Sequence, residues 1–134
     1  MTTNAQLVEA TLEALAEKVG DPAPYVYARL FQEFPETEAL FVRDTSGAVR
    51  GEMLAVAFQC ILDLEGRGAY AANLIAAERV NHEGVGVPPE AFARFFPILA
   101  ETCRELLGEA WGPAADGAWA ELLVRLEAVC RTPE

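Results

Sequence analysis

The chain has 134 residues, of which 52% are hydrophobic and 23% charged, so it is long enough for one globular domain and too short for two. Ten lysine and arginine residues against 21 aspartate and glutamate residues give a net charge of -11, which disfavours binding to nucleic acid or anionic lipid. No apolar run reaches the ~18 residues that span a bilayer, and the polar segment 1–6 does not resemble a secretion signal. We therefore expect a cytoplasmic protein with no membrane partner.

The first part of the chain predicts two helices and a short third piece. Thr3 and Gln6 have the spacing of a capping box ahead of an apolar stripe that ends at Gly20. Asp21-Pro22 begins a second helix, because proline is tolerated in a first turn, and Pro35 opens the third piece. The residues expected to face inward are Val8, Leu12, Leu15, Val19, Val26, Tyr27, Leu30, Phe31 and Phe34.

A polar connection over 43–48 separates this part from the next two predicted helices. The first of them is broken by Gly66-Arg67-Gly68, and the second covers residues 69–82. The residues expected to face inward are Val49, Met53, Leu54, Ala57, Phe58, Ile61, Leu74, Ile75 and Ala77.

A glycine- and proline-rich corner over 84–89 leads into a long helix that Gly108 ends. Pro97 lies within it and should kink or shorten it, because proline lacks a backbone donor. A last helix begins at about Pro113. The apolar residues expected inside these two helices are Phe92, Phe95, Phe96, Leu99, Cys103, Leu106, Leu107, Trp119, Leu122, Leu123, Leu126 and Val129. No segment alternates with the period of a strand, so the prediction is a single all-α domain over residues 1–134.

Three cysteines and one histidine are the candidate metal ligands. Cys60, Cys103 and Cys130 are odd in number, widely spaced and set among apolar residues, which favours reduced core thiols over a disulfide frame or a zinc site. His82 ends a predicted helix, where a lone histidine is more often a solvated side chain than a ligand.

Aromatic residues at particular spacings favour a ligand role for the histidine. Tyr27 precedes the pair Phe34-Pro35 and Phe41 follows it, His82 precedes the run Gly-Val-Gly-Val-Pro-Pro, and Ala118-Trp119 opens the apolar stripe of the last helix. This combination resembles the globin family, in particular the single-chain bacterial globins and the globin domain of flavohaemoglobins. The resemblance covers about residues 21–129 and implies six to eight helices packed around a haem pocket.

The resemblance implies a role for several residues. His82, the one imidazole, is the expected iron ligand, with its other ring nitrogen bonded to a carbonyl in the preceding turn. Phe41 would stack on the porphyrin, Val87 would touch its edge, and the Tyr27 hydroxyl would donate to the gas ligand. For Phe41 and Tyr27, an ordinary place in the core remains the alternative reading.

Further positions concern the two faces of the haem. Leu54 matches the apolar distal position, and Arg50, one turn earlier, could lie in the distal pocket, on a haem propionate as Arg43 could, or in solvent. Phe92 occupies the position where flavohaemoglobins carry a tyrosine of a hydrogen-bond relay to the proximal histidine. The glutamate partner of that relay is not expected within this chain, so the resemblance implies a neutral, myoglobin-like proximal side.

Three functions are compatible with these features. The favoured one is a haem-binding globin that reversibly binds dioxygen or another diatomic gas, as a monomer or a homodimer. An enzyme that detoxifies nitric oxide would need a separate reductase, and Phe92 lowers its odds. A haem-free globin-like regulatory or interaction module is the third, because apolar stripes at helical spacing are more often core than cofactor site.

Overall fold

The computed structural model describes residues 2–131, in which all regular secondary structure is helical and no strand occurs. This confirms the all-α prediction. Within this part of the chain, six α-helices and two short 3₁₀ helices follow one another as α1 (Asn4–Val19), α2 (Ala23–Glu33), η1 (Pro35–Phe41), α3 (Ala48–Glu65), α4 (Ala71–Gly84), α5 (Pro89–Leu107), η2 (Gly108–Ala110) and α6 (Gly112–Arg131).

The start of α1 has the predicted capping box. The Thr3 hydroxyl oxygen accepts a hydrogen bond from the Gln6 backbone N–H at 3.1 Å, and the Gln6 side-chain oxygen accepts one from the Thr3 N–H at 2.9 Å. These two bonds satisfy donors that have no partner within the helix. At the other end Gly20 adopts a φ of 73°, which L-residues with a side chain rarely adopt, and the helix stops there.

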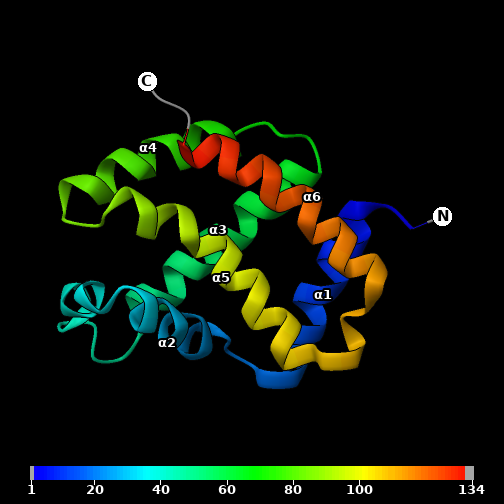
Figure 1. Ribbon diagram of the computed structural model, residues 1–134, viewed down its shortest axis with the longest axis horizontal. Helices are drawn as coiled ribbons and strands as arrows, with labels where there is room; N and C mark the ends of the chain where they lie inside the picture. The colour runs from blue at the N-terminus through cyan, green and yellow to red at the C-terminus, as the bar shows by residue number, and fades with distance from the viewer. Residues whose placement is uncertain (1, 132–134) are drawn as a thin grey trace.

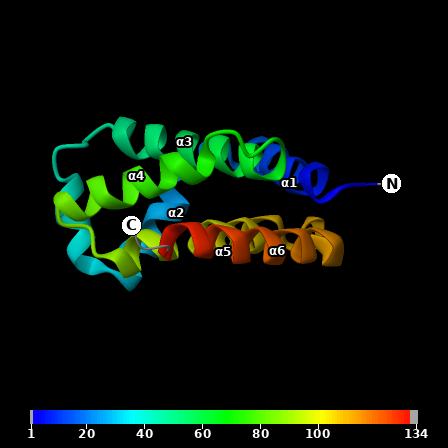
Figure 2. The same ribbon diagram turned by 90° about the horizontal axis from the view of Figure 1, so that it is seen from above.

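The helices form two layers. Seen from above, α1, α3 and α4 lie on one side and α5 and α6 on the other, with α2 between them (Figure 2). Helix α5 contacts α1, α2, α4 and α6, and it crosses the middle of the molecule in Figure 1. Helix α1 packs against α6, so the first and last helices close one end of the core. The opposite end is built from α2, η1, α3, α4 and the first half of α5 (Figure 1).

Three expectations from the sequence are corrected by this arrangement. Of the two effects expected of Pro97, a kink or a shorter helix, the shortening does not occur, because α5 runs without a break from Pro89 to Leu107 and has buried residues on both sides of the proline. Packing outweighs the single lost backbone donor. Val49 and Ala77 face outward, with 53% of Val49 exposed. Both residues lie at the edge of the apolar stripe of their helix, where no neighbouring helix covers them.

An ion-pair network holds α2 against α5. Arg94 on α5 donates to the Glu33 carboxylate on α2, with Nε 2.9 Å from Oε2, and also to Glu101 two turns further along its own helix. The hydrogen bond from Arg94 lowers the pKa of Glu33. These side chains are partly exposed, so the network orients the two helices more than it stabilises them.

A buried hydrogen bond joins the first and last helices. The Trp119 indole N–H donates to the Thr11 hydroxyl oxygen at 2.9 Å, and that hydroxyl donates to the Val8 carbonyl at 2.6 Å. Thr11 and Trp119 are both buried, so the indole N–H has no access to water. The Thr11 hydroxyl is therefore the acceptor on which the burial of Trp119 depends.

We expect Thr11→Val to lower the free energy of unfolding by about 1–3 kcal/mol, because the substitution leaves the buried indole N–H without an acceptor. Chemical denaturation measures the change. Thr102→Val is the matched control: Thr102 is equally buried, but its hydroxyl donates only to the Ile98 carbonyl of its own helix, so its loss leaves no donor without a partner. Equal losses in the two variants would contradict this role for Thr11.

Candidate functional site

An apolar cavity of about 190 Å³ lies at the end of the molecule formed by α2 to α5. It is many times larger than the space one water needs. Its wall combines aliphatic and aromatic side chains with a small number of polar groups, as is usual for a ligand pocket. The lining residues are Tyr27, Leu30, Thr37, Phe41, Glu52, Met53, Val56, Ala57, Cys60, Leu74, Ile75, Glu78, His82, Val87, Ala91, Phe92, Phe95 and Phe96.

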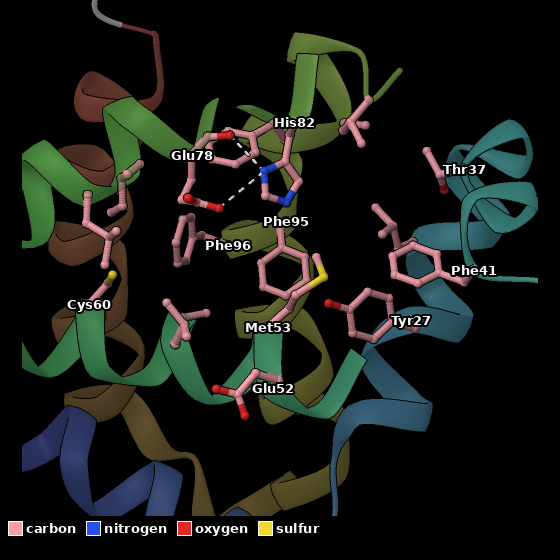
Figure 3. A pocket seen from close by; sticks show the side chains of 18 residues that line it. Tyr27, Thr37, Phe41, Glu52, Met53, Cys60, Glu78, His82, Phe95 and Phe96 are labelled. Atoms are coloured by element: carbon pink, nitrogen blue, oxygen red, sulfur yellow. Dashed lines mark hydrogen bonds and ion pairs between the residues drawn. The ribbon is translucent and has the colours of Figure 1, made fainter. Parts of the chain in front are cut away.

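His82, in the last turn of α4, points into this cavity (Figure 3). Its Nδ1 lies 2.7 Å from the backbone carbonyl oxygen of Glu78, one turn earlier. Because a carbonyl can only accept, Nδ1 must carry the proton and donate. In the neutral imidazole the lone pair is then on Nε2, which faces the cavity (Figure 3). The hydrogen bond expected from the sequence is present, and it prepares Nε2 as a metal donor.

A carboxylate also stands beside the imidazole. Oε2 of Glu78 lies 3.7 Å from the same Nδ1, so one residue presents both its carbonyl and its side chain to this nitrogen. The Phe92 ring lies on His82 with a centroid separation of 5.2 Å and has no group that could form a hydrogen bond with it. Glu78 was not among the predicted site residues, although its place four residues before His82 on a helix was a usable signal.

Tyr27 reaches the cavity from α2. The residue is only 1% exposed, and its ring packs against those of Phe31, Phe41 and Phe95 at centroid distances of 5.5–5.9 Å. Its buried hydroxyl has no hydrogen-bond partner and is turned toward the cavity (Figure 3). Burial raises the pKa of this hydroxyl, while the nearby charges of Arg50 and Asp44 act in opposite directions. It therefore remains a protonated donor.

Five of the seven predicted site residues share this cavity, and two do not. His82, Tyr27, Phe41, Val87 and Phe92 all line it. Leu54 lies in the hydrophobic core, 2% exposed, and does not line the cavity, whereas the adjacent Met53 does. A rotation of ~100° per residue separates neighbouring side chains on a helix, so the difference is one of helix orientation.

Arg50, the other exception, is held by Asp44. Its Nε donates to Asp44 Oδ2 at 3.0 Å, and a terminal nitrogen donates to the Asp44 carbonyl at 2.8 Å. The Asp44 carboxylate also accepts from the backbone N–H groups of Val49 and Arg50, and the bond from Val49 is the main cause of its lowered pKa. Arg50 thus takes part in the structure that begins α3, outside the cavity wall.

Other lining residues were not predicted as site residues. The Met53 thioether and the Cys60 thiol project from α3, and Thr37 contributes a buried hydroxyl that already donates to the Phe34 carbonyl. Burial, followed by the charges of Asp63 and Glu78, raises the pKa of Cys60, which keeps it a thiol. Cys60 and Cys103 are free and buried, as the sequence predicted, and Cys130 is buried as well.

The comparison with known protein families agrees with this arrangement. The globin family model matches residues 25–130, which include every residue that lines the cavity. The chain belongs to the globin family. No curated protein and no solved structure matches it. Globins generally bind haem and use it to bind diatomic gases, and the all-helical architecture of this chain is that of a globin.

The cavity of this globin suits a haem on three grounds. Its wall is almost entirely apolar, as an extended porphyrin surface requires. One imidazole presents a free nitrogen to it, and one buried hydroxyl there lacks a partner. The described residues contain no group of three or more side chains that could hold a metal ion by themselves. A single imidazole therefore suits a metal whose remaining ligands come from a macrocycle.

None of the described helices is both long and apolar enough to cross a membrane.

We expect the His82 imidazole of the haem-free globin to be protonated at Nδ1 when neutral, because only that tautomer can donate to the Glu78 carbonyl. The chain has one histidine, so nitrogen-15 correlation spectra of the ring contain a single pair of ring signals and need no assignment by mutation. A ring protonated at Nε2 would contradict the geometry.

Proposed function

We propose that this globin holds haem through Nε2 of His82 and reversibly binds dioxygen or another diatomic gas. The observation that carries the proposal is the pairing of two groups across one apolar cavity: an imidazole whose free nitrogen faces inward and a buried tyrosine hydroxyl with no partner. Haem, when bound, would supply an iron that can take His82 and a gas as ligands.

The protein's own residues have separate tasks in this proposal. The Glu78 carbonyl orients His82 and keeps its Nε2 unprotonated. Phe41, Val87 and Phe92 supply apolar surface for the porphyrin and exclude water. The Tyr27 hydroxyl lies at the wall of the cavity, where it can donate a hydrogen bond to a bound gas that acquires partial negative charge. Leu54 belongs to the hydrophobic core, and Arg50 fixes the start of α3.

Two other functions can be distinguished from this one by experiment. A nitric oxide dioxygenase would use the same cavity with electrons from a separate reductase, and turnover of nitric oxide in the presence of an added reductase detects it. A haem-free regulatory or interaction module would take up no haem. Its absorption spectrum after reconstitution would lack the intense Soret band of a ligated haem.

We expect His82→Ala to abolish stable haem incorporation, because no other imidazole exists in the chain. Titration of the apoprotein with haem, followed by absorption spectroscopy, measures this. Imidazole added to the variant should restore a ligated spectrum by occupying the space that the side chain leaves. A variant that keeps the wild-type spectrum would show that another group is the ligand. A wild-type chain that forms no Soret band would support the haem-free module.

We expect Tyr27→Phe to raise the dissociation rate of dioxygen by about tenfold or more, and that of carbon monoxide much less. A hydrogen bond contributes ~0.5–1.5 kcal/mol net, more to a partly charged acceptor in a dry site, and ~1.4 kcal/mol is tenfold in an equilibrium constant. Carbon monoxide acquires less charge and depends less on the donor. Stopped-flow spectroscopy measures both rates.

Tyr25→Phe is the control for this experiment, since Tyr25 lies on the same helix with 47% of its surface exposed. It should leave both rates unchanged. Unaltered dioxygen release in Tyr27→Phe would remove Tyr27 from the gas site and leave no polar donor there from α2.

A further inference from the structure

The proximal side of the cavity contains a charge that the sequence did not lead us to expect. Within one turn of α4, the Glu78 carbonyl lies 2.7 Å from Nδ1 of His82 and the Glu78 carboxylate lies 3.7 Å from it. Both interactions are drawn as dashed lines in Figure 3. The carbonyl accepts a hydrogen bond from the Nδ1 N–H group, and the carboxylate places a negative charge beside the same group.

A second hydrogen bond fixes the carboxylate in this position. The other carboxylate oxygen of Glu78, Oε1, accepts from the Asn81 side-chain amide at 3.1 Å. One oxygen is therefore anchored by Asn81 while the other remains directed at the imidazole. The Glu78 side chain is 40% exposed and that of His82 22%, so solvent weakens the interaction without abolishing it.

The charge of Glu78 also reaches a group that lines the cavity from another helix. Cys60, on α3, lines the same cavity, and the charge of Glu78 is one of the causes that raise the pKa of its thiol, after burial and Asp63. The carboxylate thus stands close enough to influence groups inside the cavity.

We propose that Glu78 is a positioning residue that makes His82 a stronger electron donor to haem iron than a carbonyl-bonded imidazole alone would be. A carboxylate beside the outer N–H of a ligating imidazole raises the basicity of the inner nitrogen. The inference rests on the proposed function, and it replaces the neutral proximal side expected from Phe92. The ring of Phe92 covers His82 but cannot accept a proton, so the negative charge comes from α4 itself.

The test compares Glu78→Gln with Glu83→Gln in the haem-reconstituted protein. Gln keeps the size of the side chain and a carbonyl oxygen for Asn81, and it removes the charge. Glu83 is exposed on the same helix and has no described contact with the ring, so its variant controls for net charge. Resonance Raman spectra of the ferrous protein measure the iron–histidine stretching frequency, and redox titration measures the reduction potential.

We expect Glu78→Gln to lower the stretching frequency and to shift the ferrous-to-ferric ratio at fixed potential by up to about tenfold toward ferrous, which equals a rise of about 59 mV for a one-electron couple. Glu83→Gln should leave the frequency unchanged. Glu78→Asp retains the charge on a shorter side chain, so it should lower the frequency with a smaller change in potential.

Each outcome decides a different question. Normal haem uptake with the same frequency in wild type and Glu78→Gln would overturn the role of Glu78 and leave the proposed function intact. Equal shifts in potential for Glu78→Gln and Glu83→Gln, with no change in frequency, would reduce the effect to net charge and also overturn it. A wild-type chain that takes up no haem would refute the proposed function, and the inference with it.

Discussion

The hydrogen bond from Nδ1 of His82 to the Glu78 carbonyl determines what the cavity can do, because it decides which ring nitrogen carries the proton. Without it the imidazole could direct either nitrogen inward. The bond is available because a carbonyl oxygen has two lone pairs, so the Glu78 carbonyl can accept from the imidazole of His82, four residues later on α4, although it lies inside the helix. The geometry of the helix therefore determines which nitrogen of His82 is free to bind a ligand. The position of His82 within its helix matters as much as its identity.

The remainder of the fold supports an apolar space at one end of the molecule. At the α1–α6 end, Trp119 and its neighbours fill the interior, and the indole N–H has its acceptor in Thr11. At the other end, α2 and α5 are held together by Arg94 and Glu33 on the outside, and both helices line the cavity on the inside. The rings of Tyr27, Phe41 and Phe95 pack on one another along this wall. Because one of these rings is a tyrosine, the apolar wall also contains a buried hydrogen-bond donor, which a wall of aliphatic side chains could not provide.

Local signals in the sequence were sufficient for the helices and for part of the site. The capping box at Thr3 and the stop at Gly20 involve neighbours in the chain, so they could be predicted without tertiary information. His82 could be singled out as the one imidazole, and Tyr27 by its spacing from Phe34-Pro35. The choice between Met53 and Leu54 depends on the rotation of α3 about its axis, which the packing of the whole molecule determines. The Asp44–Arg50 pair and the orientation of the Glu78 side chain depend on rotamers, and a residue pattern does not specify rotamers.

The bond between Thr11 and Trp119 also has a consequence for the order of folding. Its partners are 108 positions apart, whereas all residues that line the cavity lie between 27 and 96. During synthesis the cavity wall therefore leaves the ribosome well before α6 can cover α1 and α5. Contacts over such a sequence separation form slowly, because a long loop must close before they contribute. The apolar faces of α1 and α5 then remain exposed to chaperones and to self-association until the last helix arrives, so substitutions at the α1–α6 contact should influence the yield of folded protein more than the chemistry of the cavity.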